Sequence, residues 1–133
     1  MPVSNDPVFA VGGRILSGVC TAAKTDLTNA TNAVKLGEAG PNGSSITAAW
    51  ALNRATLVAA SVIQLYRSPD EGTTLILLDA VEMKAADAGK GAVDFERFAP
   101  DAPMAIDAGD WLYAGSTQAL AGGIAVHVAV EDR

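Results

Sequence analysis

Residues 122–133 read GGIAVHVAVEDR, and they predict one β-strand with two unlike faces. Branched apolar side chains stand at the even positions from Ile124 to Val130, and smaller or polar side chains stand between them. Side chains that alternate with a period of two lie on opposite faces of a strand. We therefore expect His127, the one histidine of the chain, on the face opposite the valines, as a strand residue rather than a catalytic base.

The same alternation recurs upstream, in segments separated by turn sequences such as GPNGSS (40–45) and SPDEGTT (68–74). Asn-Gly and Pro-Asp-Glu-Gly supply the positive φ angles and preset turns that join antiparallel strands. This spacing of short strands and turns predicts an all-β fold, an antiparallel β-sandwich of about eight strands that is jelly-roll-like. The strands are expected near 14–22, 31–36, 45–53, 55–67, 73–85, 103–106, 110–117 and 123–131.

The alternation also assigns the aromatic side chains to faces. In ITAAWAL (46–52) the even positions, Trp50 among them, share one face. TTLILLDAVEM (73–83) is apolar on both faces at first, which is typical of a central strand. Because the chain is poor in aromatic residues, we expect Trp50 and Trp111 to fill the core. The alternative, which stays open, is that Trp50, Trp111 and Tyr113 are exposed and stack against sugar rings.

The first thirteen residues differ from the rest, because two prolines and the pair Gly12–Gly13 interrupt the alternation. We expect an extended N-terminal arm over residues 1–13 and a single β-sandwich domain over residues 14–133. Such an arm gains order only against a partner. The residues expected to contact that partner are Pro2, Val3, Pro7, Val8 and Phe9.

The net charge of −6 is placed unevenly along the chain. Residues 1–50 carry three acids and three bases, whereas residues 51–133 carry twelve acids and six bases and hold the whole excess. Affinity for nucleic acid depends on clustered lysine and arginine side chains that release counterions from the phosphates. The sequence therefore argues against direct binding of DNA or RNA.

The residues that usually carry chemistry are few and show no catalytic spacing. With one cysteine, Cys20, the chain has no internal disulfide and no cysteine-pair zinc site, and Cys20 is expected to be a small buried residue. No G-x-S-x-G turn accompanies His127. The acids of the turns, Asp70, Asp101 and Asp107 among them, fit no calcium-loop pattern and are expected to be solvated. We expect no catalytic residue, no cofactor and no metal ion.

The N-terminal sequence lacks a basic start followed by an apolar run, so no secretory signal is expected. No stretch approaches the roughly 20 uninterrupted apolar residues of a membrane helix. The sequence predicts a soluble chain that is made in the cytoplasm and binds no membrane.

Five sequence pieces occur in an order that resembles a family of small structural proteins encoded by tailed bacteriophages, prophages and phage-like particles. The resemblance covers roughly residues 14–132. None of the pieces is a catalytic motif. They are TNAVKL (31–36), GPNGS (40–44), QLYRSPDEGTT (64–74), AGDWLYAG (108–115) and LAGGI (120–124).

The resemblance implies a virion protein, a capsid decoration (cement) protein on the outside of the major capsid protein lattice, which stabilises the head. Proteins of that functional class are commonly homotrimers. An alternative is a carbohydrate-binding β-sandwich module associated with the tail or with host attachment. A third function, a hydrolase with His127 as its base, is disfavoured because no nucleophile motif accompanies the histidine.

Overall fold

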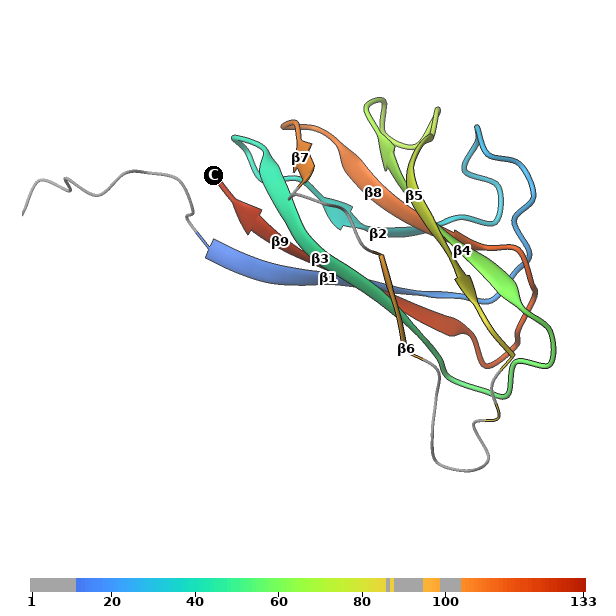
Figure 1. Ribbon diagram of the computed structural model, residues 1–133. Coiled ribbons are helices and arrows are strands. Elements are labelled where there is room, and N and C mark those ends of the chain that lie inside the picture. Colours follow the sequence, from blue (N-terminus) through green and yellow to red (C-terminus); the bar gives the residue numbers. More distant parts are fainter. Residues whose placement is uncertain (1–11, 86, 88–94, 99–103) are drawn as a thin grey trace, which may run out of the picture.

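The computed structural model describes residues 12–85, 87, 95–98 and 104–133, and within them every regular element is a β-strand (Figure 1). The strands form two antiparallel sheets that pack face to face, so the predicted all-β sandwich is confirmed. The strands are β1 (Gly12–Cys20), β2 (Val34–Glu38), β3 (Ser44–Asn53), β4 (Ser61–Ser68), β5 (Ile76–Met83), β6 (Phe95–Phe98), β7 (Met104–Ile106), β8 (Trp111–Ser116) and β9 (Ile124–Asp132).

The strand order is that of a jelly roll. The first sheet, called sheet A, has the order β1-β9-β3-β6, and β7 also pairs with β3. The second, sheet B, has the order β2-β8-β4-β5. The chain passes repeatedly from one sheet to the other. As a result, the first and last strands are neighbours in sheet A. In their pairing Gly12 lies opposite Asp132, and Cys20 lies opposite Ile124. β1 therefore includes Gly12 and Gly13, the last two residues of the predicted arm.

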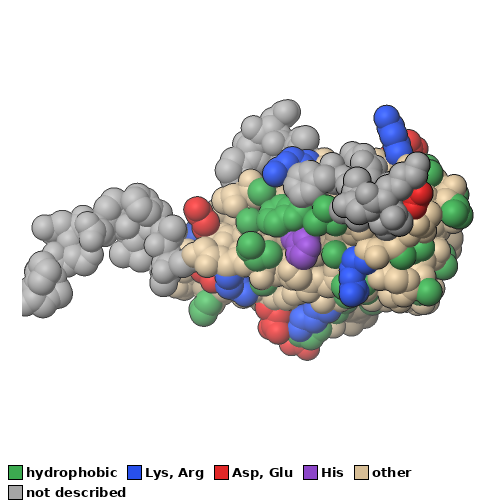
Figure 2. Space-filling model, turned by 90° about the horizontal axis from the view of Figure 1, so that it is seen from below, with side chains coloured by type: hydrophobic (Ala, Val, Ile, Leu, Met, Phe, Trp, Pro, Cys, Tyr) green, Lys and Arg blue, Asp and Glu red, His purple; other side chains and the backbone are tan. Residues whose placement is uncertain are grey.

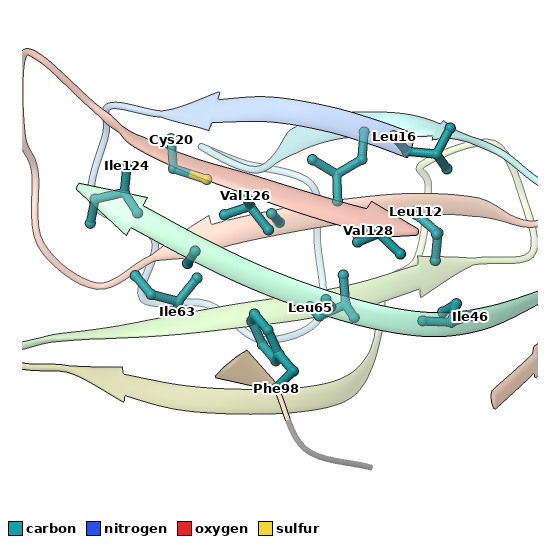
Figure 3. Close-up of a cluster of buried hydrophobic side chains, with 14 of the residues drawn as sticks. Leu16, Cys20, Ile46, Ile63, Leu65, Phe98, Leu112, Ile124, Val126 and Val128 are labelled. Carbon is teal, nitrogen blue, oxygen red and sulfur yellow. The ribbon is translucent and has the colours of Figure 1, made fainter. Parts of the chain in front are cut away.

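The core lies between the two sheets, where apolar side chains from both inner faces meet (Figure 3). On β9 the even-numbered residues Ile124, Val126 and Val128 are fully buried, as the alternation predicted. On β4 of the other sheet, Ile63 and Leu65 are fully buried and face them. Interdigitated branched side chains of this kind supply most of the free energy that stabilises a sandwich.

A β-bulge in β3 corrects the predicted position of Trp50. The register against β9 shifts between Ile46 and Ala48, so one extra residue lies in β3 at that point. Because one residue of slip moves every later side chain to the other face, Ala49 and Ala51 are buried, and Trp50 lies on the outer face of sheet A, where it is half-buried. The prediction that Trp50 fills the core is wrong. Trp111 is likewise only half-buried, whereas its neighbour Leu112 is in the core.

Three strands also differ from the sequence prediction. The segment predicted as one strand from 55 to 67 becomes a strand only at Ser61. β5 lies at the edge of sheet B, so it is not the central strand that its apolar sequence indicated. β6 was not predicted, because it is short and half of it is charged, yet Phe98 brings a buried ring to the core.

The outer face of sheet B is covered by the β1–β2 connection, which holds a buried lysine. Only 1% of Lys24 is exposed, and its Nζ donates to the backbone oxygens of Asn29 (2.5 Å) and Thr31 (3.3 Å). The same nitrogen lies 5.3 Å from the centre of the Tyr66 ring. Burial lowers the pKa of Lys24 and raises that of Tyr66 to about 12, since desolvation disfavours both charged forms.

A salt bridge joins the strand ends at one end of the sandwich. The Nε of Arg14 in β1 donates to Oδ2 of Asp132 in β9 at 2.7 Å, and its Nη2 donates to Oδ1 at 3.1 Å. The Ser44 hydroxyl in β3 donates to the same Oδ1 at 2.6 Å. Because Arg14 Nη2 also donates to the backbone oxygen of Glu38 in β2, at 2.6 Å, this cluster ties sheet A to sheet B.

Candidate functional site

The outer face of sheet A is the surface that carries the one histidine and one of the two tryptophans. Antiparallel pairing aligns Ser17 of β1 with His127 of β9, His127 with Trp50 of β3, and Trp50 with Arg97 of β6. Residues two positions away along each strand flank this row on the same face. We call the set the A face: Ile15, Ser17, Val19, Ala48, Trp50, Leu52, Arg97, Ala125, His127 and Ala129.

The A face is largely apolar, and most of its side chains are half-buried. The side chains that flank the row of His127 are alanine, leucine, isoleucine and valine. Ile15 is 60% exposed. Figure 2 shows the histidine beside a group of hydrophobic side chains on this side of the molecule. A contiguous apolar surface of this kind is typical of a protein–protein contact.

His127 makes two contacts on the A face. Its Nδ1 lies 2.7 Å from the Ser17 hydroxyl oxygen, and its ring centre lies 5.5 Å from that of Trp50, with the two planes inclined by 33°. The structure therefore places His127 opposite the buried valines, as the sequence predicted.

Ser17 beside His127 forms one part of the geometry of nucleophilic catalysis, a hydroxyl next to an imidazole. A triad also needs a group that orients the imidazole through its second nitrogen, and donors for the oxyanion. No carboxylate of the described residues hydrogen-bonds to His127; its second neighbour is the Trp50 ring. The contact fits a polar pair that fixes two side chains within an apolar surface.

Sequence reasoning missed Ser17, Ile15 and Arg97 as members of the A face. The alternation of RILSGVC (14–20) does separate Ile15, Ser17 and Val19 from the inward Leu16 and Cys20. The pairing of Ser17 with His127 depends on strand register across 110 positions of sequence, which no local pattern reveals.

The second tryptophan lies at a different place, on the outer side of sheet B. Trp111 is stacked with Tyr113 at 6.5 Å between ring centres. Lys35 Nζ lies 3.4 Å from the centre of the Trp111 ring and 2.9 Å from Oε2 of Glu38. A lysine held over the indole face by a cation–π contact occupies the surface on which a sugar ring would stack. Trp50 and Trp111 thus stand on opposite sheets and form no common platform.

The acidic turns hold the backbone in shape. Asp70 accepts the Thr74 N–H at 2.8 Å and the Ser68 hydroxyl at 2.9 Å, and these bonds lower the pKa of its carboxyl. Asp110 was expected to be solvated with the other turn acids, but it is only 4% exposed, and it accepts the Asp107 N–H at 2.9 Å. Within the part of the chain that the structure describes, no three metal-ligating side chains come together.

Two further sequence predictions concern Cys20 and the N-terminal arm. Cys20 is 1% exposed, and desolvation raises the pKa of its thiol to about 12, so it is the buried residue that was expected. The predicted partner-contacting residues lie outside the described residues: Pro2, Val3, Pro7, Val8 and Phe9. Asp101, one of the predicted turn acids, also lies outside them.

Comparisons of the chain with protein-family models, with curated proteins and with solved structures each give no match. The described part of the chain contains no helix of the length and hydropathy needed to cross a membrane.

Proposed function

We propose that this protein is a structural subunit of a tailed-bacteriophage or phage-like virion. In this proposal it is a capsid decoration protein, made in the host cytoplasm, that binds the outside of the major capsid protein lattice and stabilises the head. The resemblance of residues 14–132 to small phage structural proteins supports this. The jelly-roll topology supports it too, because viral capsid domains use this architecture.

The observation that carries the proposal is the A face. Its half-buried apolar side chains, together with Ile15, which is 60% exposed, fit a protein that acts by packing against other proteins. In this proposal the chain acts as a structural subunit, not as an enzyme, and uses no cofactor. The proposed partners are the major capsid protein and further copies of this chain, in a homotrimer.

Co-sedimentation tests this function directly. Purified protein is mixed with capsid shells of the particle that carries it, and separately with purified tails of the same particle. We expect binding to shells that saturates at a fixed ratio to the capsid protein and raises the temperature at which the shells disrupt. Binding to tails alone, or to neither particle, would refute the capsid function.

A carbohydrate-binding module on a tail remains a second candidate, favoured by one observation. Trp50 is half-buried on the outer face of a sheet, where indole rings stack on sugars. Titration with host surface polysaccharide, followed by tryptophan fluorescence, separates the two functions. The decoration function predicts unchanged emission. A saturable change that is lost in Trp50→Ala, with the melting temperature unaltered, would favour the sugar module.

A further inference from the structure

Most edge strands of the two sheets are short or bulged within the described part of the chain. Sheet A ends in β1 on one side and in β6 and β7 on the other, and sheet B ends in β2 and β5. β6 and β7 have only four and three residues. β2 and β5 each take part in a register shift, against β8 between Lys35 and Gly37 and against β4 between Leu65 and Tyr66. Short length and bulges are features by which edge strands avoid pairing with another chain.

The edge strand β1 has none of these features. All nine of its residues pair with β9 without a register shift. Its one charged side chain, Arg14, is bonded to Asp132 of the same chain, and Ile15 and Ser17 are exposed. Alternate residues of an edge strand turn their N–H and C=O groups away from the sheet. The edge of β1 that faces away from β9 can therefore accept one further strand.

The eleven residues before β1, MPVSNDPVFAV (1–11), are long enough to cover this edge. Extended, a segment of that length spans about 36–40 Å, whereas a strand of nine residues spans about 30 Å. Three valines and Phe9 favour a strand, and one side chain of the segment is charged. This composition suits pairing through the backbone.

The sequence opposes a hairpin between this segment and β1 of the same copy. Gly12–Gly13 is already paired with β9, so it cannot form the turn. A two-residue turn directly before it would fall on Ala10–Val11, and the favoured turns need positive φ angles that a β-branched residue resists. A turn at Asn5–Asp6 would leave only four residues to pair. The segment therefore fits β1 of a second copy.

Pro7 determines which backbone groups of the segment can face β1. Proline has no N–H, so an edge strand tolerates it only where its nitrogen points away from the neighbouring strand. Backbone groups alternate in direction from one residue to the next along a strand. Asn5 therefore shares the direction of Pro7, whereas the N–H of Ala10 points toward β1. Pro2 would also point toward β1, so the pairing begins after it.

We propose that residues 3–11 of one copy add a strand to the edge of β1 in a second copy. Main-chain hydrogen bonds supply the affinity of such strand addition. Each copy provides one segment and receives another, so the contacts close into a ring when the rotation between copies allows it, as a homotrimer requires. The inference rests on the proposed function for the role of this ring at the capsid surface, but the contact itself belongs to the free protein.

Sedimentation velocity of the full-length chain tests the contact with two proline variants. Ala10→Pro removes an N–H that faces β1 and should weaken association at least about tenfold, because the lost hydrogen bond and the proline ring both oppose the pairing. Asn5→Pro is the matched control, because its nitrogen points away from β1, and it should associate like wild type. Circular dichroism checks that both variants keep the β-sandwich, whose described core contains neither residue.

Amide hydrogen exchange locates the contact on β1. In wild type and in Asn5→Pro, exchange from β1 should slow at concentrations at which the chain associates, and in Ala10→Pro at the same concentration it should stay fast. The proposal is wrong if Ala10→Pro leaves association unchanged, if both variants weaken it equally, or if association leaves exchange from β1 unaltered. A wild-type chain that stays monomeric at every concentration would also overturn it. Because no shell is present, such a result leaves the capsid function to be decided by co-sedimentation.

Discussion

Replacing Asp132 by Asn tests the salt bridge that joins the two sheets. Asp132 is the acceptor for Arg14 Nε at 2.7 Å and for the Ser44 hydroxyl at 2.6 Å. The substitution keeps the size of the side chain and removes its charge. It therefore weakens contacts among β1, β3 and β9, and it also loosens the Arg14 side chain that reaches the Glu38 carbonyl of β2.

The expected loss in the free energy of unfolding is moderate, because both charged side chains are partly exposed to solvent. The side chains of Arg14 and Asp132 are 38% and 21% exposed, so solvent screening limits the ion pair to about 1 kcal/mol. The hydrogen bond from Ser44 to a charged acceptor adds about 1 kcal/mol. Together these give a loss of about 1–2 kcal/mol in the free energy of unfolding at neutral pH.

The pH dependence of this loss has a definite sign. The Arg14 guanidinium and the Ser44 hydroxyl hold the pKa of Asp132 below its ordinary value. A carboxyl with a depressed folded pKa stabilises above its unfolded pKa of about 3.9 and loses that contribution as pH falls through the folded value. Urea unfolding should therefore show wild type and Asp132→Asn separated at pH 7 and converging below about pH 4. Glu131→Gln, an exposed neighbour, is the control. A separation that is equal at both pH values would refute the reasoning.

Three further predictions concern burial. Ile63→Ala should lower the free energy of unfolding by about 2–5 kcal/mol, because Ile63 is 0% exposed between the sheets. Calorimetry measures this loss. A loss below about 1 kcal/mol would place Ile63 outside the core. Trp50→Ala should lower the free energy of unfolding by less, about 1–2 kcal/mol, because the indole ring is only half-buried. A loss as large as that for a ring in the core would contradict the outward position of Trp50. Cys20, with a pKa of about 12 and 1% exposure, should react with a thiol reagent at pH 8 only after unfolding in urea. Prompt reaction of the folded protein would show that the thiol is accessible.

The sheet architecture could be predicted because the core of a sandwich selects alternate residues. In β9 the even positions are branched and the odd ones are not, so the buried face was evident. In β3 alanines stand at positions 48, 49 and 51, and small side chains fit either face. The bulge there left no signal in the sequence, and it moved Trp50 out of the predicted core.

The surfaces of the molecule were harder to predict, because they depend on strand register and on which loops pack over each sheet. Lys24 stands in a polar loop, and its burial depends on carbonyl groups that the same loop turns inward. Ser17 meets His127 only through the pairing of β1 with β9. The lysine over Trp111 likewise depends on the pairing of β2 with β8. Alternation within single strands carries none of this information.

Cryo-electron microscopy of shells saturated with this protein tests the central claim most directly, namely that the chain is an external capsid subunit that packs through its A face. We expect jelly-roll density at fixed positions outside the capsid lattice, with Ile15 and Trp50 in contact with protein. Shells without added density, or density in which the A face is open to solvent and touches no protein, would contradict it.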